Sequence, residues 1–143
     1  MSWFFELPWL SDLALLVLRL VVGVMFLLSG YFKLVDGERR EKMRQSLGKA
    51  GLPSVLAAPL AAVELLGGLS VVFGLVTVVG ALALLAISLG ALVSTAWPEA
   101  EGNGIHKLEN LLYSPEAILV AGLLCLMALG AGDWSLDAAL RAA

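Results

Sequence analysis

Apolar residues fill four long stretches of this chain, and two polar segments interrupt them. About 20 apolar residues at 1.5 Å rise cross the roughly 30 Å hydrocarbon layer of a bilayer, so each stretch is long enough for a membrane helix. The sequence predicts helices near residues 13–35, 55–74, 77–97 and 111–131. We therefore predict an all-α membrane protein, in which residues 1–143 form a single domain: a bundle of four antiparallel transmembrane helices.

The second and third predicted helices come from one apolar run, residues 55–97, which is about twice as long as a bilayer span. Gly74 is expected to end the second helix, and Thr77 is expected to cap the third. A connection this short makes the two helices antiparallel neighbours.

The first predicted helix carries a polar seam. Arg19, Gly23, Phe26, Gly30 and Lys33 follow one another at steps of four, three, four and three, which places them on one face. An arginine near the bilayer centre costs roughly 2.5–3.5 kcal/mol on insertion scales, so this face should turn toward other helices. Its glycines would let those helices approach closely.

The second predicted helix places its sole charge, Glu64, on a face with Ala57, Ala61 and Gly68. We expect Glu64 to pair with Arg19. The two residues differ in their expected depth in the membrane, but both side chains are long enough to bridge this difference. Two interpretations stay open: a structural ion pair that fixes helix packing, or a polar pocket for a ligand headgroup or a proton-accepting carboxylate.

Further polar residues lie near the start of the fourth predicted helix and are candidates for the same pocket. Tyr113 and Glu116 join Arg19, Lys33 and Glu64 as candidate binding residues of the polar interior, with Asn110 and His106 at its edge. The helix dipole alone would also favour Glu116 at a helix start. His106 with one neighbouring acid or amide does not complete a metal site, so we predict none.

The polar segments 36–54 and 98–110 must share one side of a four-span bundle. The first is rich in bases and is expected to be either a solvated basic loop or a short amphipathic helix on the membrane surface, with Met43 and Leu47 four residues apart. The positive-inside rule places both segments in the cytoplasm and both termini outside a plasma or inner cell membrane.

Composition agrees with a polytopic membrane protein. The chain is 60% hydrophobic and 15% charged, with a mean hydropathy of +0.94 and a net charge of −3. No basic cluster with interleaved aromatic residues indicates nucleic acid. The single cysteine, Cys125, is expected to be a small buried apolar residue, and a single cysteine excludes an intrachain disulfide.

The N-terminal residues 1–12 include Trp3, Phe4, Phe5 and Trp9, and we predict that they form an interfacial segment that is retained in the protein.

Several of these strings together resemble the DoxX family. They are Arg19, the glycine-rich string from Gly23 to Leu34, ELLGGL at 64–69 with Gly74, and GAGDWSLDAAL at 130–140. The resemblance covers Arg19, Gly30, Lys33, Glu64, Gly68 and the Ser135-Leu136-Asp137 tail. It implies a four-helix membrane bundle, a loose relation to the DoxD subunit of thiosulfate:quinone oxidoreductase, and a role as a membrane partner of redox or assembly machinery.

These observations favour a non-enzymatic membrane module that binds a lipid- or quinone-like molecule, or a redox or assembly partner protein, through its polar interior. The alternative is a quinone-docking subunit of an oxidoreductase linked to sulfur compounds or oxidative stress. Such a subunit would need a partner protein to supply electrons, because the chain lacks redox-active cysteine pairs and haem or flavin motifs. No cofactor is evident beyond such a quinone or lipid. Gly67, Gly80, Gly90 and Gly122 are too many small positions for one bundle to bury, so a homo-oligomer, most simply a dimer, is also expected.

Overall fold

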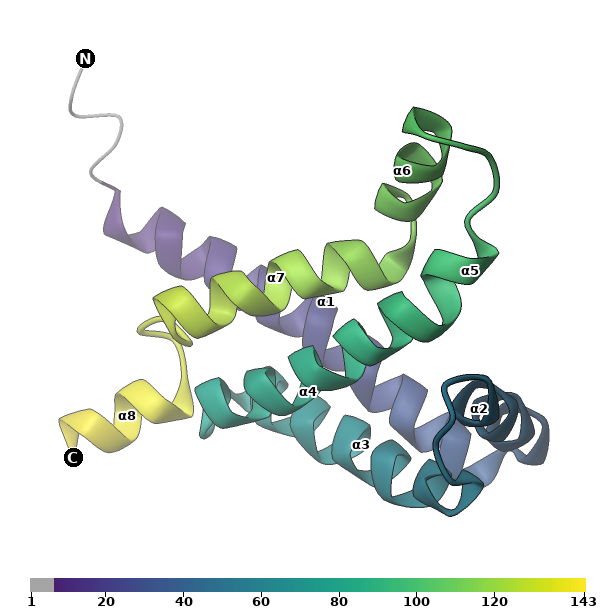
Figure 1. The fold of residues 1–143 in the computed structure, drawn as a ribbon. Helices are drawn as coiled ribbons and strands as arrows, with labels where there is room; N and C mark the ends of the chain where they lie inside the picture. The colour runs from purple at the N-terminus through teal and green to yellow at the C-terminus, as the bar shows by residue number, and fades with distance from the viewer. Residues whose placement is uncertain (1–6) are drawn as a thin grey trace.

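The computed structural model describes residues 7–143, and all the secondary structure in this part of the chain is helical (Figure 1). The predicted interfacial residues Trp3, Phe4 and Phe5 lie outside the described residues. The helices are α1 (Pro8–Val35), α2 (Gly37–Lys49), η2 (Ser54–Leu56), α3 (Ala57–Phe73), α4 (Thr77–Ala91), the π-helical turn η3 (Leu92–Ala96), α5 (Trp97–Glu99), α6 (Ile105–Leu112), α7 (Pro115–Leu129) and α8 (Leu136–Ala142).

Within residues 7–143, three helical segments are long and apolar enough to cross a membrane: Pro8–Val35, Ser54–Phe73 and Thr77–Glu99. A fourth span requires α6 and α7 to be taken together, and these two helices meet at a bend of 64°. The prediction of an all-α membrane protein is confirmed.

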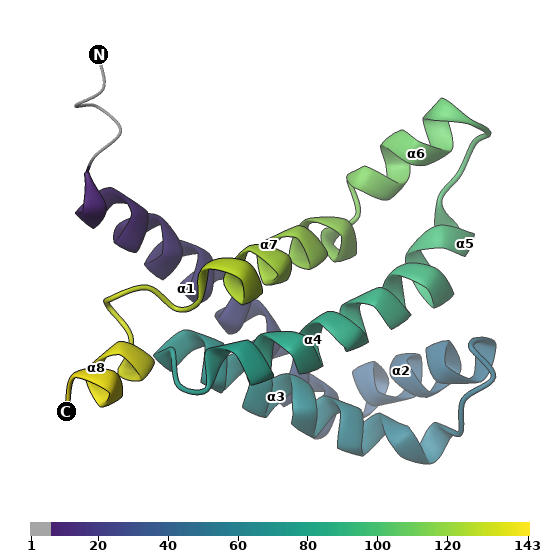
Figure 2. The ribbon, with the colours of Figure 1, turned by 60° about the vertical axis from the view of Figure 1, so that its left-hand side comes forward.

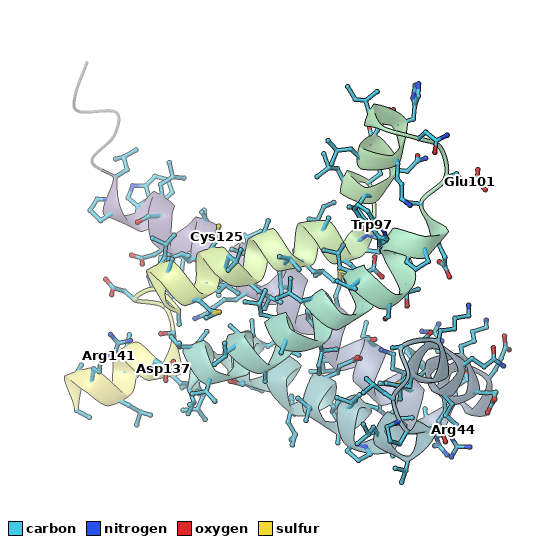
Figure 3. All side chains as sticks on the ribbon, viewed as in Figure 1. Arg44, Trp97, Glu101, Cys125, Asp137 and Arg141 are labelled. Carbon is cyan, nitrogen blue, oxygen red and sulfur yellow. The ribbon has the colours of Figure 1, made fainter. Side chains whose placement is uncertain are left out.

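The long helices α1, α3, α4 and α7 run in alternating directions side by side (Figures 1 and 2). Helices α2, α5 and α6 lie at one end of this bundle, and α8 lies at the other. Figure 3 shows labelled charged residues at both ends, with Arg44 and Glu101 at the α2 end and Asp137 and Arg141 at the α8 end. This arrangement places both polar segments at one end, as four alternating helices require.

Close contact between α1 and α3 fixes the register of the two helices. A Cβ atom added to Gly30 would lie 2.5 Å from the backbone nitrogen of Leu65 and 2.6 Å from the carbonyl oxygen of Ala61. A Cβ atom on Gly68 would lie 2.5 Å from the backbone nitrogen of Leu27. Four of the five residues of the predicted seam, Arg19, Gly23, Phe26 and Gly30, are buried, and the fifth, Lys33, is half-buried. Glycine allows backbones to touch here, which brings Glu64 beside Gly30.

The apolar core lies between α1, α3, α4 and α7. Its buried members include Val22, Phe26, Val71, Leu84, Leu123 and Leu126. Cys125 is exposed on the outer side of α7, so the expectation that it is buried is wrong. It points outward because Leu123 and Leu126 occupy the inner face of the helix.

The oligomer prediction rests on four glycines, and three of them contact other residues of the same chain. Gly67 faces Leu84, Gly80 faces Ser70, and Gly122 faces Val22 and Leu18. Gly90 is different, because a Cβ atom added there meets nothing within 4 Å. The homo-oligomer therefore loses most of its original argument and stays a prediction.

The turn between α3 and α4 and the start of the fourth helix differ in part from expectation. Gly74 does end α3, with a left-handed φ of 66°. Thr77 is not the cap of α4, because Val76 occupies that position. The predicted helix at 111–131 is broken: Ser114 caps α7, which begins at Pro115, and residues before the break form α6. Proline at the first helical position explains this start.

Candidate functional site

A buried ion pair joins α1 to α3 near the α2 end of the bundle. The Lys33 Nζ atom lies 2.7 Å from both carboxylate oxygens of Glu64 and donates to them. Ser29 Oγ donates to Glu64 Oε2 at 2.9 Å. The Glu64 side chain is only 3% exposed, whereas that of Lys33 is 26% exposed. The buried carboxylate is thus held by a cation and a hydroxyl, both supplied by α1.

This pairing corrects the expected Arg19–Glu64 pair. The glycine contacts set the register so that Glu64 lies beside Gly30, less than one helical turn from Lys33 along α1. Arg19 lies eleven residues away from Gly30 in sequence, about 16 Å at 1.5 Å per residue, which is beyond the reach of its side chain.

The Lys33–Glu64 pair lines a cavity of about 720 Å³ between α1, α2, α3 and α4. Apolar side chains of α2, α3 and α4 form much of its wall, among them Met43, Leu47, Leu60, Ala86 and Ile87. We call this space, with Ser29, Lys33 and Glu64 as its polar wall, the charged-pair cavity. An enclosure that is mainly apolar and has a few converging polar groups is typical of small-molecule sites.

Helix α2 covers one side of the charged-pair cavity. Its Leu47 is buried and its Met43 is half-buried, and both face the cavity. Of the two alternatives for residues 36–54, the structure shows a helix and not a loop, but the apolar side of this helix covers the cavity. Its location on a membrane surface stays a prediction. Arg39 and Lys42 lie at the cavity edge, where Asp36 and Glu38 pair with them.

A π-helical turn, η3, lies where α4 passes the cavity. Residues Leu92–Ala96 form this turn between α4 and α5. Ser94 and Thr95 of η3 line the charged-pair cavity, and Thr95 also lines a second cavity of about 420 Å³ beside α6. Single π-helical turns inside α-helices occur frequently at functional sites. The turn thus supports the cavity as the functional site.

The five candidate binding residues are divided between different places. Lys33, Glu64 and Glu116 line the charged-pair cavity. Tyr113 is 80% exposed and lines neither cavity. Asn110 lines the second cavity with Glu116, and it donates to the carbonyl oxygen of Glu101 at 2.8 Å. Within residues 7–143, no group of three or more His, Cys, Asp and Glu side chains is placed to hold a metal ion.

Arg19 fastens the C-terminal segment to α1, at the opposite end of the bundle. Its guanidinium donates to the carbonyl oxygens of Ala131 and Trp134, both at 2.8 Å. Its guanidinium also lies against the backbone of Gly74, where any added Cβ atom would clash. Arg19 is thus a structural residue that holds the segment after α7 against the α3–α4 turn.

Asp137 also joins the C-terminal segment to the α3–α4 turn, through hydrogen bonds. No local sequence pattern indicates that it has this role. One carboxylate oxygen accepts from Val76 N at 2.7 Å, and the other accepts from Thr77 N at 2.9 Å and Thr77 Oγ1 at 2.8 Å. Asp137 therefore caps α4 from a distant part of the chain, where the helix dipole favours a negative charge. The family-like tail string pointed to Asp137, but no local spacing connected it with Thr77. Ser135 does cap α8, as its sequence position suggests.

We expect Asp137→Asn to lower the free energy of unfolding by about 1–2 kcal/mol, because the amide nitrogen cannot accept a hydrogen bond and leaves a donor of Val76 or Thr77 unpaired. Burial acts against the charge, but hydrogen bonds from Thr77 and Val76, with the charge of Arg141, lower the pKa of Asp137 below its ordinary value. The stabilisation is therefore complete above the ordinary carboxyl pKa of about 4 and is lost as the pH falls through the lowered value.

Thermal unfolding of both proteins between neutral pH and pH 3 measures this contribution. The difference in melting temperature should be largest at neutral pH and should shrink in acid. Asp133→Asn is the control, because the Asp133 side chain is exposed. Equal effects of the two substitutions at every pH would contradict the cap.

Comparison with known proteins gives two matches. The sequence model of the family described as DoxX matches residues 14–97. The protein named "Putative oxidoreductase CatD" from Bacillus subtilis (strain 168) is 38% identical over 84 residues, which cover 58% of this chain and 60% of that protein. The chain thus spans about 60% of the length of this curated relative. No solved structure gave a significant match.

Proposed function

Because the chain belongs to the DoxX family of membrane proteins, we propose that its bundle is a binding module for a lipid- or quinone-like molecule, which occupies the charged-pair cavity. The observation that carries the proposal is the cavity itself. Its volume of about 720 Å³ falls within the range of about 300–1,000 Å³ that is usual for small-molecule sites. Its lining combines apolar walls with the Lys33–Glu64 ion pair and a few further polar side chains, which suits an amphipathic molecule.

The charges around the cavity disfavour an anionic ligand. Lys33 and Glu64 already neutralise each other, and Arg39 and Lys42 have the acidic neighbours Asp36 and Glu38. The remaining charge in the lining, Glu116, is half-buried and forms no ion pair within the described residues. An anionic ligand would therefore add a second uncompensated negative charge to a partly desolvated space, which costs free energy. A carbonyl group is a better fit, because the Lys33 ammonium carries three protons and can donate to a ligand acceptor beside Glu64.

Filling the cavity tests this proposal. Gly90 of α4 lines the cavity, and a Cβ atom there meets nothing within 4 Å, so the side chain introduced by Gly90→Leu should extend into the cavity and occupy ligand space. We expect purified protein in nanodiscs to bind decyl-ubiquinone or menadione saturably in titration calorimetry. We expect Gly90→Leu to weaken that binding at least tenfold without lowering the melting temperature.

Gly48→Leu is the matched control, because Gly48 is also helical and open but does not line the cavity. Native mass spectrometry of the same samples shows whether a co-purified lipid, rather than a quinone, is lost from Gly90→Leu. Equal affinity of Gly90→Leu and the unsubstituted protein, with no difference in bound lipid, would refute the cavity as the binding site.

A second candidate is a quinone-docking subunit of an oxidoreductase, which the name of the Bacillus subtilis relative favours. Reduction of a quinone to a quinol takes two electrons and two protons. The chain has one cysteine and no dithiol within a copy, so a redox partner protein would supply the electrons. Quinone reduction by the isolated chain, without such a partner, would reverse the order of the two candidates.

The positive-inside rule supports a cytoplasmic location for the α2 end of the bundle in a plasma or inner cell membrane. Most bases outside the spans lie at that end, namely Arg39, Arg40, Lys42, Arg44, Lys49 and Lys107. Arg141 lies at the α8 end. In this orientation the charged-pair cavity is near the cytoplasmic surface, where a soluble or membrane-bound partner can approach it.

A further inference from the structure

Helix α6 exposes an apolar face that nothing in the described part of the chain covers. Ile105, Leu108 and Leu112 are 77%, 52% and 61% exposed and share one side of the helix. Polar residues occupy the opposite side, including His106, Lys107 and Asn110. In Figures 1 and 2, α6 projects away from the packed helices beyond the end of α7. Water is a poor environment for three large apolar side chains on one short helix.

The bend between α6 and α7 indicates how α6 lies relative to the bilayer. Helix α7 packs in the bundle beside α4, and transmembrane helices tilt on average by about 20° from the bilayer normal. A turn of 64° from the axis of α7 therefore places α6 between about 44° and 84° from the bilayer normal, which makes it an inclined or surface-lying helix and not a continuation of the span. Helix α7 alone is about 22 Å long at 1.5 Å per residue, roughly 8 Å short of the 30 Å hydrocarbon layer. If α7 reaches the opposite edge of that layer, α6 begins in its outermost part.

The neighbours of α6 are of the kinds found at membrane interfaces. Trp97 is half exposed, and the Lys107 Nζ atom lies 4.9 Å from the centre of its ring. Tyr113, at the end of α6, is 80% exposed. Tryptophan and tyrosine concentrate at the level of lipid headgroups, and lysine extends toward them. On the polar side of α6, Asn110 and the acids Glu99 and Glu101 line the second cavity.

We propose that α6 is an interfacial helix whose apolar face binds the lipid bilayer at the boundary between headgroups and acyl chains. Ile105, Leu108 and Leu112 enter the acyl region and continue the exposed apolar surface of α7, which includes Ile118. His106 and Asn110 face water. Helix α7 then provides most of the fourth crossing, and α6 covers the remaining depth as it turns toward the membrane surface. This surface is independent of the charged-pair cavity.

Spin labels on the two faces of α6 test the proposal in a Cys125→Ala background, which removes the native thiol. The labelled variants are Leu108→Cys on the apolar face and His106→Cys on the polar face, with Ile105→Cys as a second apolar position. All three side chains are exposed, so the labels replace no packed residue. Power saturation is measured in nanodiscs of phosphatidylcholine with phosphatidylglycerol, using oxygen and a water-soluble nickel chelate as relaxation agents.

The labels at 105 and 108 should collide mainly with oxygen and report a depth of about 5–10 Å below the headgroups, as for interfacial helices. The label at 106 should collide mainly with the nickel chelate. Equal nickel accessibility at 106 and 108 would place α6 in water and overturn the proposal. Spin–spin broadening at 108 that disappears on dilution with unlabelled protein would instead show a second copy on this face, and would overturn it equally.

Discussion

Gly30→Ala is expected to lower the free energy of unfolding by about 3 kcal/mol, at the upper end of the range for overpacked cores. The new Cβ atom would lie 2.5 Å from Leu65 N and 2.6 Å from Ala61 O, and both of these are backbone atoms. Neither can move without shifting the whole of α3, so α1 and α3 must separate. Thermal unfolding in a single detergent, followed by circular dichroism, measures the loss.

Gly90→Ala provides the control for this prediction. It makes the same chemical change in a membrane helix, but its Cβ atom meets nothing within 4 Å, so stability should stay constant or rise slightly because alanine favours helix. Similar melting temperatures for Gly30→Ala and Gly90→Ala would show that α1 and α3 do not touch at Gly30.

Lys33→Leu should destabilise the bundle by about 3 kcal/mol, because it leaves the buried Glu64 carboxylate without its counter-charge. Exposure of the Lys33 side chain to solvent lowers this figure from the top of the range for buried pairs. The double substitution Lys33→Leu with Glu64→Leu should recover much of the stability, since it removes both charges from the interior.

The four proteins of this double-mutant cycle are compared by thermal unfolding in one detergent. We expect a coupling above about 1 kcal/mol between positions 33 and 64. The exposed Lys42–Glu38 pair of α2 is the matched control, with an expected coupling below about 0.5 kcal/mol. Additive effects at positions 33 and 64 would mean that the two side chains do not meet.

The sequence predicted the helices and their buried faces well, because membrane helices must hide polar groups and small residues. The spacing of Arg19, Gly23, Phe26 and Gly30 identified the buried seam of α1. On α3, the residues chosen for one face, Ala57, Ala61, Glu64 and Gly68, are all buried. In both helices the helical period and the cost of exposing a charge to lipid are enough to identify the buried face.

Partners across helices could not be derived in the same way. Two helices can slide along each other while keeping the same faces together, and only the contacts at Gly30 and Gly68 select the register that brings Lys33 to Glu64. The break before α7 was predictable, since Ser114 and Pro115 form a typical helix start. The role of Asp137 depends on a tail folding back onto Thr77, which no local pattern encodes.

The contacts of Arg19 have a consequence for biosynthesis. Its acceptors, the carbonyl oxygens of Ala131 and Trp134, lie 112 and 115 residues further along the chain. At about 5–20 residues per second, a ribosome needs roughly 6–23 s to reach them after it has made Arg19. During that time the first membrane helix carries an unmatched cation. Insertion of α1 therefore has to be completed at a moment when its most polar residue still relies on water, lipid headgroups or the translocation machinery.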